Sequence, residues 1–508
     1  MTSIPELLAD RAARWGDVDA VVDGATRLTF AQLAAQASKV AACFIERGIE
    51  PGDRVAIWAP NRHEWILTAL GLQLAGAALV PLNTRFKGTE VAGVLARTRA
   101  RALVTVGSFL GADYPGMLEP HRAALPDLAD VFVLDGSPHA WVRPWEELAV
   151  DLSAGDGLVW DRARDIRDDD VCDILFTSGT TGVPKGAMCT HGVTVRAFET
   201  FCEVVGLRPG DRYLIVNPFF HAFGYKAGWL SCLIAGATAY PLPVFDVDDA
   251  LATIASEGIT VFPGPPTVYW SIMESGRARR DDLASLRLSI TGSTTVPTEL
   301  IRRMQDELTF EHILVGFGLT EANGLGTMCR PDDPPRVVAE TSGRAIPGME
   351  LQIADDGEIL LRGHLMKGYF EDPEATAEAI DADGWLHTGD IGWLDDDANL
   401  HVTDRKKDMF IVGGFNVYPA EVEATLLGHP AVAQSAVVGA PDDRLGEVGH
   451  AFVIPRHDAA IDADELLAWC RTRMANFKVP RWITICDELP MTANGKVQKT
   501  VLRDRSHQ

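Results

Sequence analysis

Positive charge is scarce in this sequence. The 508-residue chain has 71 aspartates and glutamates against 46 lysines and arginines, which gives a formal net charge of −25. Such a field opposes nucleic acids and anionic membrane surfaces, so we expect neither as a partner. It would also oppose an anionic substrate. A site for one would need particular lysines, arginines, backbone N–H groups or a metal to reverse the local sign.

The sequence also lacks the cysteine and histidine spacings that are typical of metal sites and disulfide frameworks. The eight cysteines are scattered without CxxC or CxxH pairs, which predicts reduced and mostly buried thiols. The thirteen histidines show no metal spacing, since HEW at 63–65 is not HExxH. No stretch approaches the roughly 18 apolar residues of a membrane span, and the start MTSIPELLADRAARW has no apolar core. We therefore expect a cytoplasmic protein without stable membrane insertion.

What is present is the pattern of a large α/β protein. Hydrophobic residues make up 47% of the chain, which excludes disorder, and the length exceeds what one core supports. Thr29 and Gln32 predict a capping box that opens a helix ending near 47–48. RVAIW at 54–58 and ALVPL at 78–82 read as strands around a helix at 65–75. This alternation predicts βαβ units and mostly parallel sheets flanked by helices.

The pattern changes after about residue 345. LQIADDGEILLRG and WLDDDANLHVTD predict hairpins, which form a β-subdomain, and Pro419 followed by Glu421 predicts a helix start. The charged segment 404–408 separates them from a final block of about 100 residues with its own strand-and-helix pattern. We therefore expect an N-terminal domain over 1–403, a hinge over 404–408, and a small mobile α+β lid over 409–508.

One polar, glycine-rich run follows the predicted strand VCDIL. Residues 176–186 read FTSGTTGVPKG, in which small residues let backbone N–H groups approach phosphate oxygens while hydroxyls and a lysine add further contacts. It is not a Walker P-loop, because Lys185 lies between Pro184 and Gly186. The alternative for such a run is a flexible loop. The candidate phosphate-binding residues are Thr177, Ser178, Gly179, Thr180, Thr181, Gly182 and Lys185.

TSGTTGVPKG resembles the signature of the adenylate-forming superfamily, which includes acyl-CoA synthetases, luciferases and peptide-synthetase adenylation domains. Further segments agree in the family's order over essentially the whole chain: NPFFHAFG at 217–224, GFGLTEANG at 316–324, WLHTGD at 385–390, DRKKD at 404–408 and PMTANGKVQK at 490–499. The resemblance implies an acid–thiol ligase that uses ATP, Mg²⁺ and coenzyme A. A carboxylic acid would form an acyl-adenylate with loss of pyrophosphate, and CoA would then displace AMP. The N-terminal domain would bind ATP and the acyl group.

The resemblance also implies roles for residues of the N-terminal domain. Glu321 would hold Mg²⁺, although a solvated acidic residue at a strand end is the alternative, and Thr320 would donate to the α-phosphate. Gly292, Ser293 and Thr294 would line the adenine and the acyl group. Phe317 replaces the family's usual tyrosine, so it keeps stacking on the purine and loses a phenol hydrogen bond. His221 would be an aromatic gate to the acyl tunnel, or else a packed core histidine.

Other roles fall near the hinge and in the lid. Asp390 would accept the ribose hydroxyls and Arg405 would add ribose or phosphate contacts, with a salt bridge or a surface turn as the alternative. Lys496 would bond the carboxylate and the α-phosphate, whereas ANGK alone reads as a turn with an exposed lysine. The lid would rotate about Lys407 and present Gly413 and Gly414 to the pantetheine arm. The candidate catalytic residues are therefore Lys496, Glu321, Thr181 and His221.

Further motifs bear on the identity of the acid. The motifs FFHAFGYKAG, PGPPTVYWS, GLTEANGLGTMCRP and GGFNVYPAEVE resemble those of actinobacterial acyl-CoA synthetases that act on the steroid C/D-ring (hexahydroindanedione) propanoate. Lys226 would bond a ring ketone there, or else face solvent. Alternatives are a medium- or long-chain fatty acid ligase, an adenylation enzyme that loads a carrier protein, and a silent nucleotide-binding protein. A homodimer is a further expectation.

Overall fold

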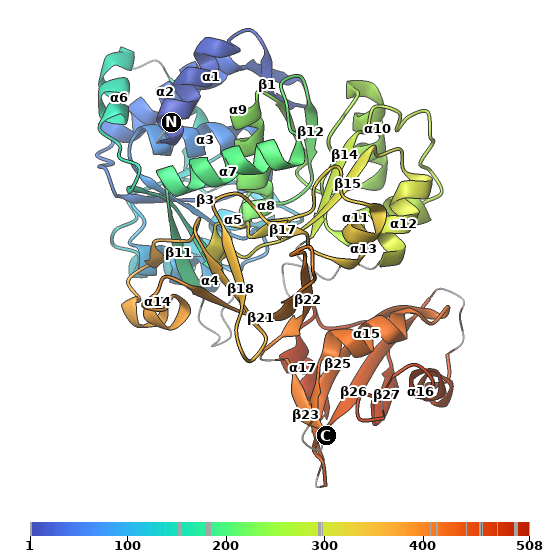
Figure 1. Ribbon diagram of the computed structural model, residues 1–508. Helices are drawn as coiled ribbons and strands as arrows, with labels where there is room; N and C mark the ends of the chain where they lie inside the picture. The colour runs from blue at the N-terminus through green and yellow to red at the C-terminus, as the bar shows by residue number, and fades with distance from the viewer. Residues whose placement is uncertain are drawn as a thin grey trace. The chain divides into compact units, whose positions relative to one another are not determined.

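The computed structural model describes residues 3–506 apart from 138, 151–154, 178–183, 293–295, 297, 407, 413–414, 443, 457–458, 460, 475 and 492–495, with the backbone alone for 155–156, 405 and 415–416. The chain forms two compact units (Figure 1). Unit 1 comprises residues 1–339, 343–350 and 361–386, and unit 2 comprises 340–342, 351–360 and 387–508. Most of unit 2 therefore begins at His387, before the expected boundary at 404–408. The hinge at 404–408 stays a prediction.

A mostly parallel sheet forms one layer of unit 1. In order across its described part, its eight strands are β20 (Gly368–Tyr369), β11 (Lys185–Thr190), β10 (Val171–Thr177), β4 (Ala78–Pro81), β3 (Arg54–Trp58), β5 (Ala102–Thr105), β8 (Asp130–Val133) and β9 (Arg143–Pro144). The strands from β10 to β9 run parallel, and β11 and β20 add antiparallel pairs at one edge. The predicted strands at 54–58 and 78–82 are confirmed.

A second set of strands carries the other half of unit 1. One sheet has the order β12 (Arg212–Ile215), β13 (Thr238–Pro241), β1 (Asp19–Asp23) and β2 (Thr26–Thr29), and another has the order β14 (Leu288–Gly292), β15 (His312–Phe317), β16 (Thr327–Met328) and β17 (Arg344–Ala345). Val261 bridges them by pairing with both Tyr213 and Leu288. The ITVFPG segment at 259–264 contributes only this bridge, since prolines and a glycine interrupt it after Phe262. A small hairpin joins β6 (Ser108–Phe109) to β7 (Ala112–Asp113).

Helices cover these sheets, with α11, α12 and α13 gathered beside β14 and β15 (Figure 1). The α-helices of this part of the chain are α1 (Ile4–Arg14), α2 (Phe30–Glu46), α3 (His63–Leu74), α4 (Gly88–Thr98), α5 (Tyr114–Leu118), α6 (Gly155–Arg164), α7 (His191–Val205), α8 (Ala222–Gly224), α9 (Ser231–Ala235), α10 (Val247–Glu257), α11 (Pro266–Glu274), α12 (Thr298–Glu307), α13 (Pro335–Glu340) and α14 (Pro373–Ala379). Short 3₁₀-helices form η1 (Glu119–Ala124), η2 (Trp145–Leu148) and η4 (Thr320–Ala322), and η3 (Tyr225–Leu230) is a π-helix.

Helix α2 shows why the sequence folds as predicted. The Thr29 hydroxyl accepts from the Gln32 N–H and the Gln32 side chain accepts from the Thr29 N–H, which completes the capping box. The helix ends at Glu46, and Gly48 follows at φ +80°, a conformation that costs glycine little. Its buried face includes Phe30, Leu33 and Val40.

Unit 2 contains the predicted hairpins and the small α+β block. One sheet has the order β18 (Glu350–Ile353), β19 (Glu358–Arg362), β21 (Leu386–Leu394) and β22 (Leu400–Arg405), and so confirms both hairpins. The other has the order β24 (Phe415–Val417), β23 (Phe410–Val412), β26 (Gly446–Pro455) and β25 (Val432–Asp442), with β27 (Trp482–Ile485) beside β26. Its helices are α15 (Pro419–Leu427), α16 (Ala463–Arg471) and α17 (Lys499–Ser506).

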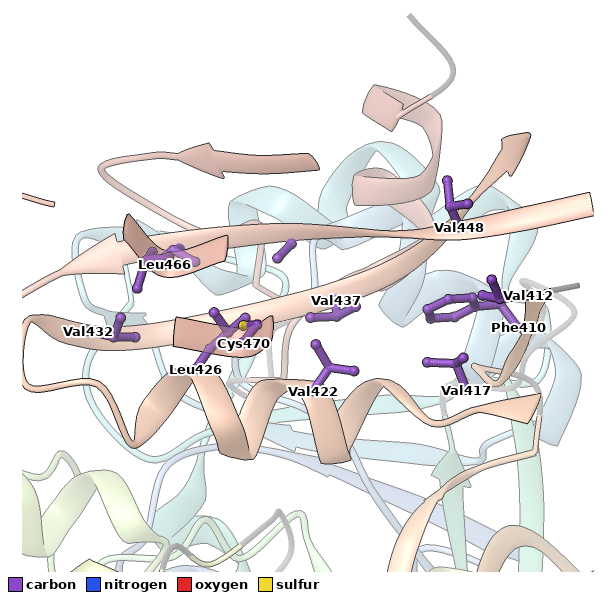
Figure 2. Close-up of a cluster of buried hydrophobic side chains, with 12 residues drawn as sticks. Phe410, Val412, Val417, Val422, Leu426, Val432, Val437, Val448, Leu466 and Cys470 are labelled. Carbon is purple, nitrogen blue, oxygen red and sulfur yellow. The ribbon is translucent and has the colours of Figure 1, made fainter. Parts of the chain in front are cut away.

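The core of unit 2 lies between α15 and the second of these sheets. Val422 and Leu426 of α15 point toward Val437 of β25, and Phe410 and Val417 close the same cluster at one end (Figure 2). All five side chains are at most 2% exposed. Pro419 occupies the first turn of α15, as the sequence predicts.

Thiols and membrane spans also bear on the sequence predictions. All eight cysteines are free, seven of them buried and Cys486 partly buried, which confirms reduced thiols. Among the described residues, no helix has both the length and the apolar character that crossing a bilayer demands.

Candidate active site

The glycine-rich run at 176–186 begins at the end of β10 and finishes at the start of β11. Thr177 and Lys185 are register partners across this antiparallel pair, and the Thr177 hydroxyl lies 3.4 Å from the Lys185 carbonyl oxygen. Ser178, Gly179, Thr180, Thr181 and Gly182 lie outside the described residues. The pairing of β10 with β11 therefore holds the two ends of the predicted phosphate loop side by side.

Glu321 comes to the same place from a distant part of the sequence. It lies in η4, which two residues separate from the end of β15, and its Oε1 atom is 3.5 Å from the Thr177 hydroxyl. The Tyr369 phenol donates to the same Oε1 atom at 2.7 Å. No described residue hydrogen-bonds to Oε2. One held and one open carboxylate oxygen suit a Mg²⁺ ion that takes its other ligands from phosphate and water.

Tyr369 is a site residue that the sequence analysis missed. It lies in β20 opposite Ala187 of β11, and the ammonium of Lys185 lies 5.2 Å from the centre of its ring. Burial, and then the Glu321 carboxylate, raise the pKa of Tyr369, so the phenol stays protonated and donates. The signal was absent because Tyr369 and Glu321 are 48 positions apart in the sequence, and the contact depends on the pairing of β20 with β11.

Two of the predicted purine-site residues, Gly292 and Phe317, lie at the ends of neighbouring parallel strands. Gly292 ends β14 beside Gly316 of β15, and a Cβ on Gly292 would come within 2.7 Å of the Gly316 carbonyl oxygen. Glycine is therefore required for this close approach of two backbones. Phe317 ends β15 half-buried, and Thr320 begins η4. Ser293 and Thr294 lie outside the described residues.

The segment after His221 packs against the Glu321 turn. His221 is partly buried and precedes α8, and its carbonyl oxygen accepts from the N–H groups of Gly224 and Tyr225. A Cβ on Gly324 would lie 2.8 Å from the Ala222 side chain. The structure thus brings Thr177, Lys185, Glu321 and the segment following His221 together in unit 1.

The other predicted site residues belong to unit 2. Asp390 of β21 and Arg405 of β22 are register partners, and Asp390 is buried. The neighbouring Lys406 pairs with Asp356 at 2.7 Å and Glu358 at 3.0 Å. Lys496 is exposed directly after residues 492–495, which lie outside the described part, as do Lys407, Gly413 and Gly414. The roles of these residues stay predictions.

Lys226 corrects the sequence analysis. It was expected to bond a ring ketone or to face solvent, but its side chain is 0% exposed. The ammonium lies 3.0 Å from Asp173 and donates to Asn323 at 2.5 Å. The neighbouring aromatic residues pack in the core: Tyr225 and Trp229 stack, and both contact Trp65. Lysine is rarely fully buried, so the sequence favours a surface position for it. No residue near Lys226 in the sequence indicates that Asp173 is its buried partner.

A cavity of about 370 Å³ lies elsewhere in unit 1, beside the ends of β3 and β5. Asp23 and His63 line it, and their ligand atoms lie within 4.8 Å of each other and of one from Glu64. Asp23 already accepts from the His63 ring at 2.8 Å, and Glu64 accepts from Arg62 at 2.9 Å. None of the predicted site residues that the structure describes lines this cavity.

Comparisons with known proteins agree with this arrangement. The model of the AMP-binding enzyme family matches residues 8–370, and that of the AMP-binding enzyme C-terminal domain matches residues 421–496. Two CoA ligases named for 3-(7a-methyl-1,5-dioxo-octahydro-1H-inden-4-yl)propanoyl are each 48% identical to this chain. The one from Rhodococcus jostii strain RHA1 aligns over 99% of this chain and 98% of its own. The one from Mycobacterium tuberculosis strain H37Rv aligns over 99% of both.

A solved structure shows the same likeness in three dimensions. The anthranilate CoA ligase AuaEII in complex with anthranoyl-AMP superposes with a TM-score of 0.87 at 28% identity, over 99% of this chain and 97% of that one. That enzyme was captured with an acyl group joined to AMP.

Proposed function

Because the chain belongs to the AMP-binding enzyme family and is an ATP-dependent acyl-CoA ligase, we propose that its acid is the 7a-methyl-1,5-dioxo-octahydroindenyl propanoate that steroid degradation leaves after loss of rings A and B. The observation that carries this substrate is the 48% identity to the Rhodococcus ligase over 508 residues. The predictions of the superfamily, the fold class and the acid–thiol ligase activity are confirmed.

The first half-reaction joins two anions, so the residues near β10 must lower their repulsion. We assign the glycine-rich loop, Thr177 and Lys185 to the ATP phosphates and the open oxygen of Glu321 to Mg²⁺. A bound Mg²⁺ would spread the charge of the phosphate oxygens. Lys185 adds positive charge where the −25 charge of the whole chain is unfavourable. Tyr369 orients Glu321 from the side.

We assign the remaining chemistry to unit 2 on the strength of the family resemblance. Asp390, supported by Arg405, would accept the ribose hydroxyls. Lys496 would donate to the attacking carboxylate and the α-phosphate. The lid would then rotate about Lys407, so that Gly413 and Gly414 admit the pantetheine thiol. The thiol attacks the acyl carbon, the bond to AMP breaks, and the thioester forms. We place this reaction in the cytoplasm, and a homodimer remains a prediction.

A panel of acids tests the substrate. We would measure AMP formation, with and without CoA, for the dioxo bicyclic propanoate, the same acid lacking its ring ketones, octanoate, palmitate and acetate. We expect the dioxo acid to give the highest kcat/KM, with AMP release dependent on CoA. Higher kcat/KM for octanoate or palmitate would replace the proposed acid with a fatty acid, and no AMP from any acid would contradict the substrate class.

A further inference from the structure

A buried ion pair lies beneath the Glu321 turn. Lys226 of η3 and Asp173 of β10 are both 0% exposed, and their charged atoms are 3.0 Å apart. Cys172 donates to the second oxygen of Asp173 at 3.2 Å. Burial lowers the pKa of Lys226. Asp173 and the nearby thiols of Cys189 and Cys172 raise this pKa by a larger amount, so the net shift is upward and the ammonium stays charged.

Asn323 connects this pair to the turn. Its Oδ1 atom accepts from the Lys226 ammonium at 2.5 Å, and its amide nitrogen donates to the Thr194 hydroxyl at 3.3 Å. Asn323 is 1% exposed and holds a left-handed conformation at φ +57°. Both polar ends of its side chain are thus held by different elements of unit 1, η3 and α7.

The turn itself is tight enough to transmit this constraint. The N–H of Asn323 donates to the Thr320 carbonyl oxygen, and the N–H groups of Ala322 and Gly324 both donate to Leu319. Any shift of Asn323 therefore displaces the backbone that carries Glu321, two residues earlier. Asp173 lies on the strand that ends at Thr177, so one ammonium links the two segments that meet at the Glu321 carboxylate.

A buried ion pair is a poor source of stability, because removing two charges from water costs as much as their attraction returns. Its value lies in fixing geometry. We propose that Lys226 is a positioning residue, which holds the Asn323 turn so that Glu321 is oriented for magnesium–ATP. This inference rests on the proposed function. A direct contact of Lys226 with the acid is disfavoured, because the ammonium is fully buried, forms an ion pair with Asp173 and donates to Asn323.

Two variants test the proposal by different routes. Asn323→Gly removes the amide and keeps the left-handed backbone, which glycine adopts at no steric cost. Lys226→Met combined with Asp173→Leu removes both charges together, so that no unpaired buried charge remains. Ala398→Gly is the control, since Ala398 also has positive φ, at +61°, in an exposed turn of unit 2.

Binding of magnesium–ATP to the full chain, measured by titration calorimetry, is the main readout. We expect both test variants to raise the Kd about tenfold, the equivalent of one hydrogen bond to a charged group, and the control to leave it unchanged. Conversion of a supplied acyl-adenylate to thioester should stay within about twofold of wild type in every variant, because this step starts from the adenylate and does not require magnesium–ATP to bind. A general loss of structure would instead weaken magnesium–ATP binding and slow thioester formation together.

Three outcomes overturn the proposal. If the wild type binds magnesium–ATP and both test variants match it, Glu321 does not depend on this network. If the KM changes only for acids that carry ring ketones, Lys226 acts on the substrate. If the wild type itself does not bind magnesium–ATP, the proposed function fails and this inference fails with it.

Discussion

Tyr369→Phe is the sharpest test of the metal-binding cluster. The substitution removes one oxygen atom and with it the 2.7 Å hydrogen bond to Glu321. The ring remains, so the contact with the Lys185 ammonium at 5.2 Å is kept. The change is therefore confined to how the Glu321 carboxylate is held.

The expected magnitude follows from the contact. A hydrogen bond to a charged group contributes about 1.5–3 kcal/mol. Glu321 is only partly buried, so water replaces part of the lost bond and the lower value applies. About 1.5 kcal/mol corresponds to a Kd for magnesium–ATP raised about tenfold. The same factor should appear in the Mg²⁺ concentration needed for adenylate formation.

Titration calorimetry and pyrophosphate exchange at varied Mg²⁺ would measure both quantities. Tyr114→Phe is the matched control, since its phenol donates to the Thr84 carbonyl oxygen outside the cluster. An unchanged Kd in Tyr369→Phe would refute the role of the phenol. Tighter binding would refute it as well, because it would mean that the phenol withdraws charge from the carboxylate instead of orienting it.

The remaining predictions concern the lid and one buried histidine. Lys496→Ala should reduce acyl-adenylate formation at least 100-fold and spare thioester formation from a supplied acyl-adenylate, and normal pyrophosphate release would contradict this. Lys407→Pro should impair thioester formation more than adenylation, and equal loss of both would argue against a hinge. Burial lowers the pKa of His191 from 6.5 to about 3. Because only the unfolded chain is protonated between these values, stability should fall by about 2 kcal/mol from pH 7 to pH 5, and His191→Gln should flatten that loss in thermal unfolding.

Local signals predicted local structure well. The capping box of α2 and the strands β3 and β4 depend on neighbouring residues, and each lies where the sequence placed it. The hairpin between β21 and β22 followed from its acidic turn in the same way. These features are determined over a few residues, so the pattern of side chains is enough to find them.

Long-range contacts were not predictable in this way. Tyr369 joins the site because β20 pairs with the edge strand β11. The residues that flank Tyr369 in the sequence do not indicate this pairing. Lys226 was read as an exposed or substrate-facing lysine because its partner Asp173 lies in a different element. A resemblance to a family supplied Glu321 as a metal ligand, whereas the groups that hold it came only from the structure.

The central claim is that a carboxylate attacks the α-phosphate of ATP. The most direct measurement supplies the acid with ¹⁸O in its carboxylate, together with ATP and CoA, and locates the label by mass spectrometry. The account predicts that AMP gains one ¹⁸O atom and that pyrophosphate gains none, because the acid's oxygen stays on phosphorus when the thiol displaces AMP. Label in inorganic phosphate, with ADP as the nucleotide product, would contradict it.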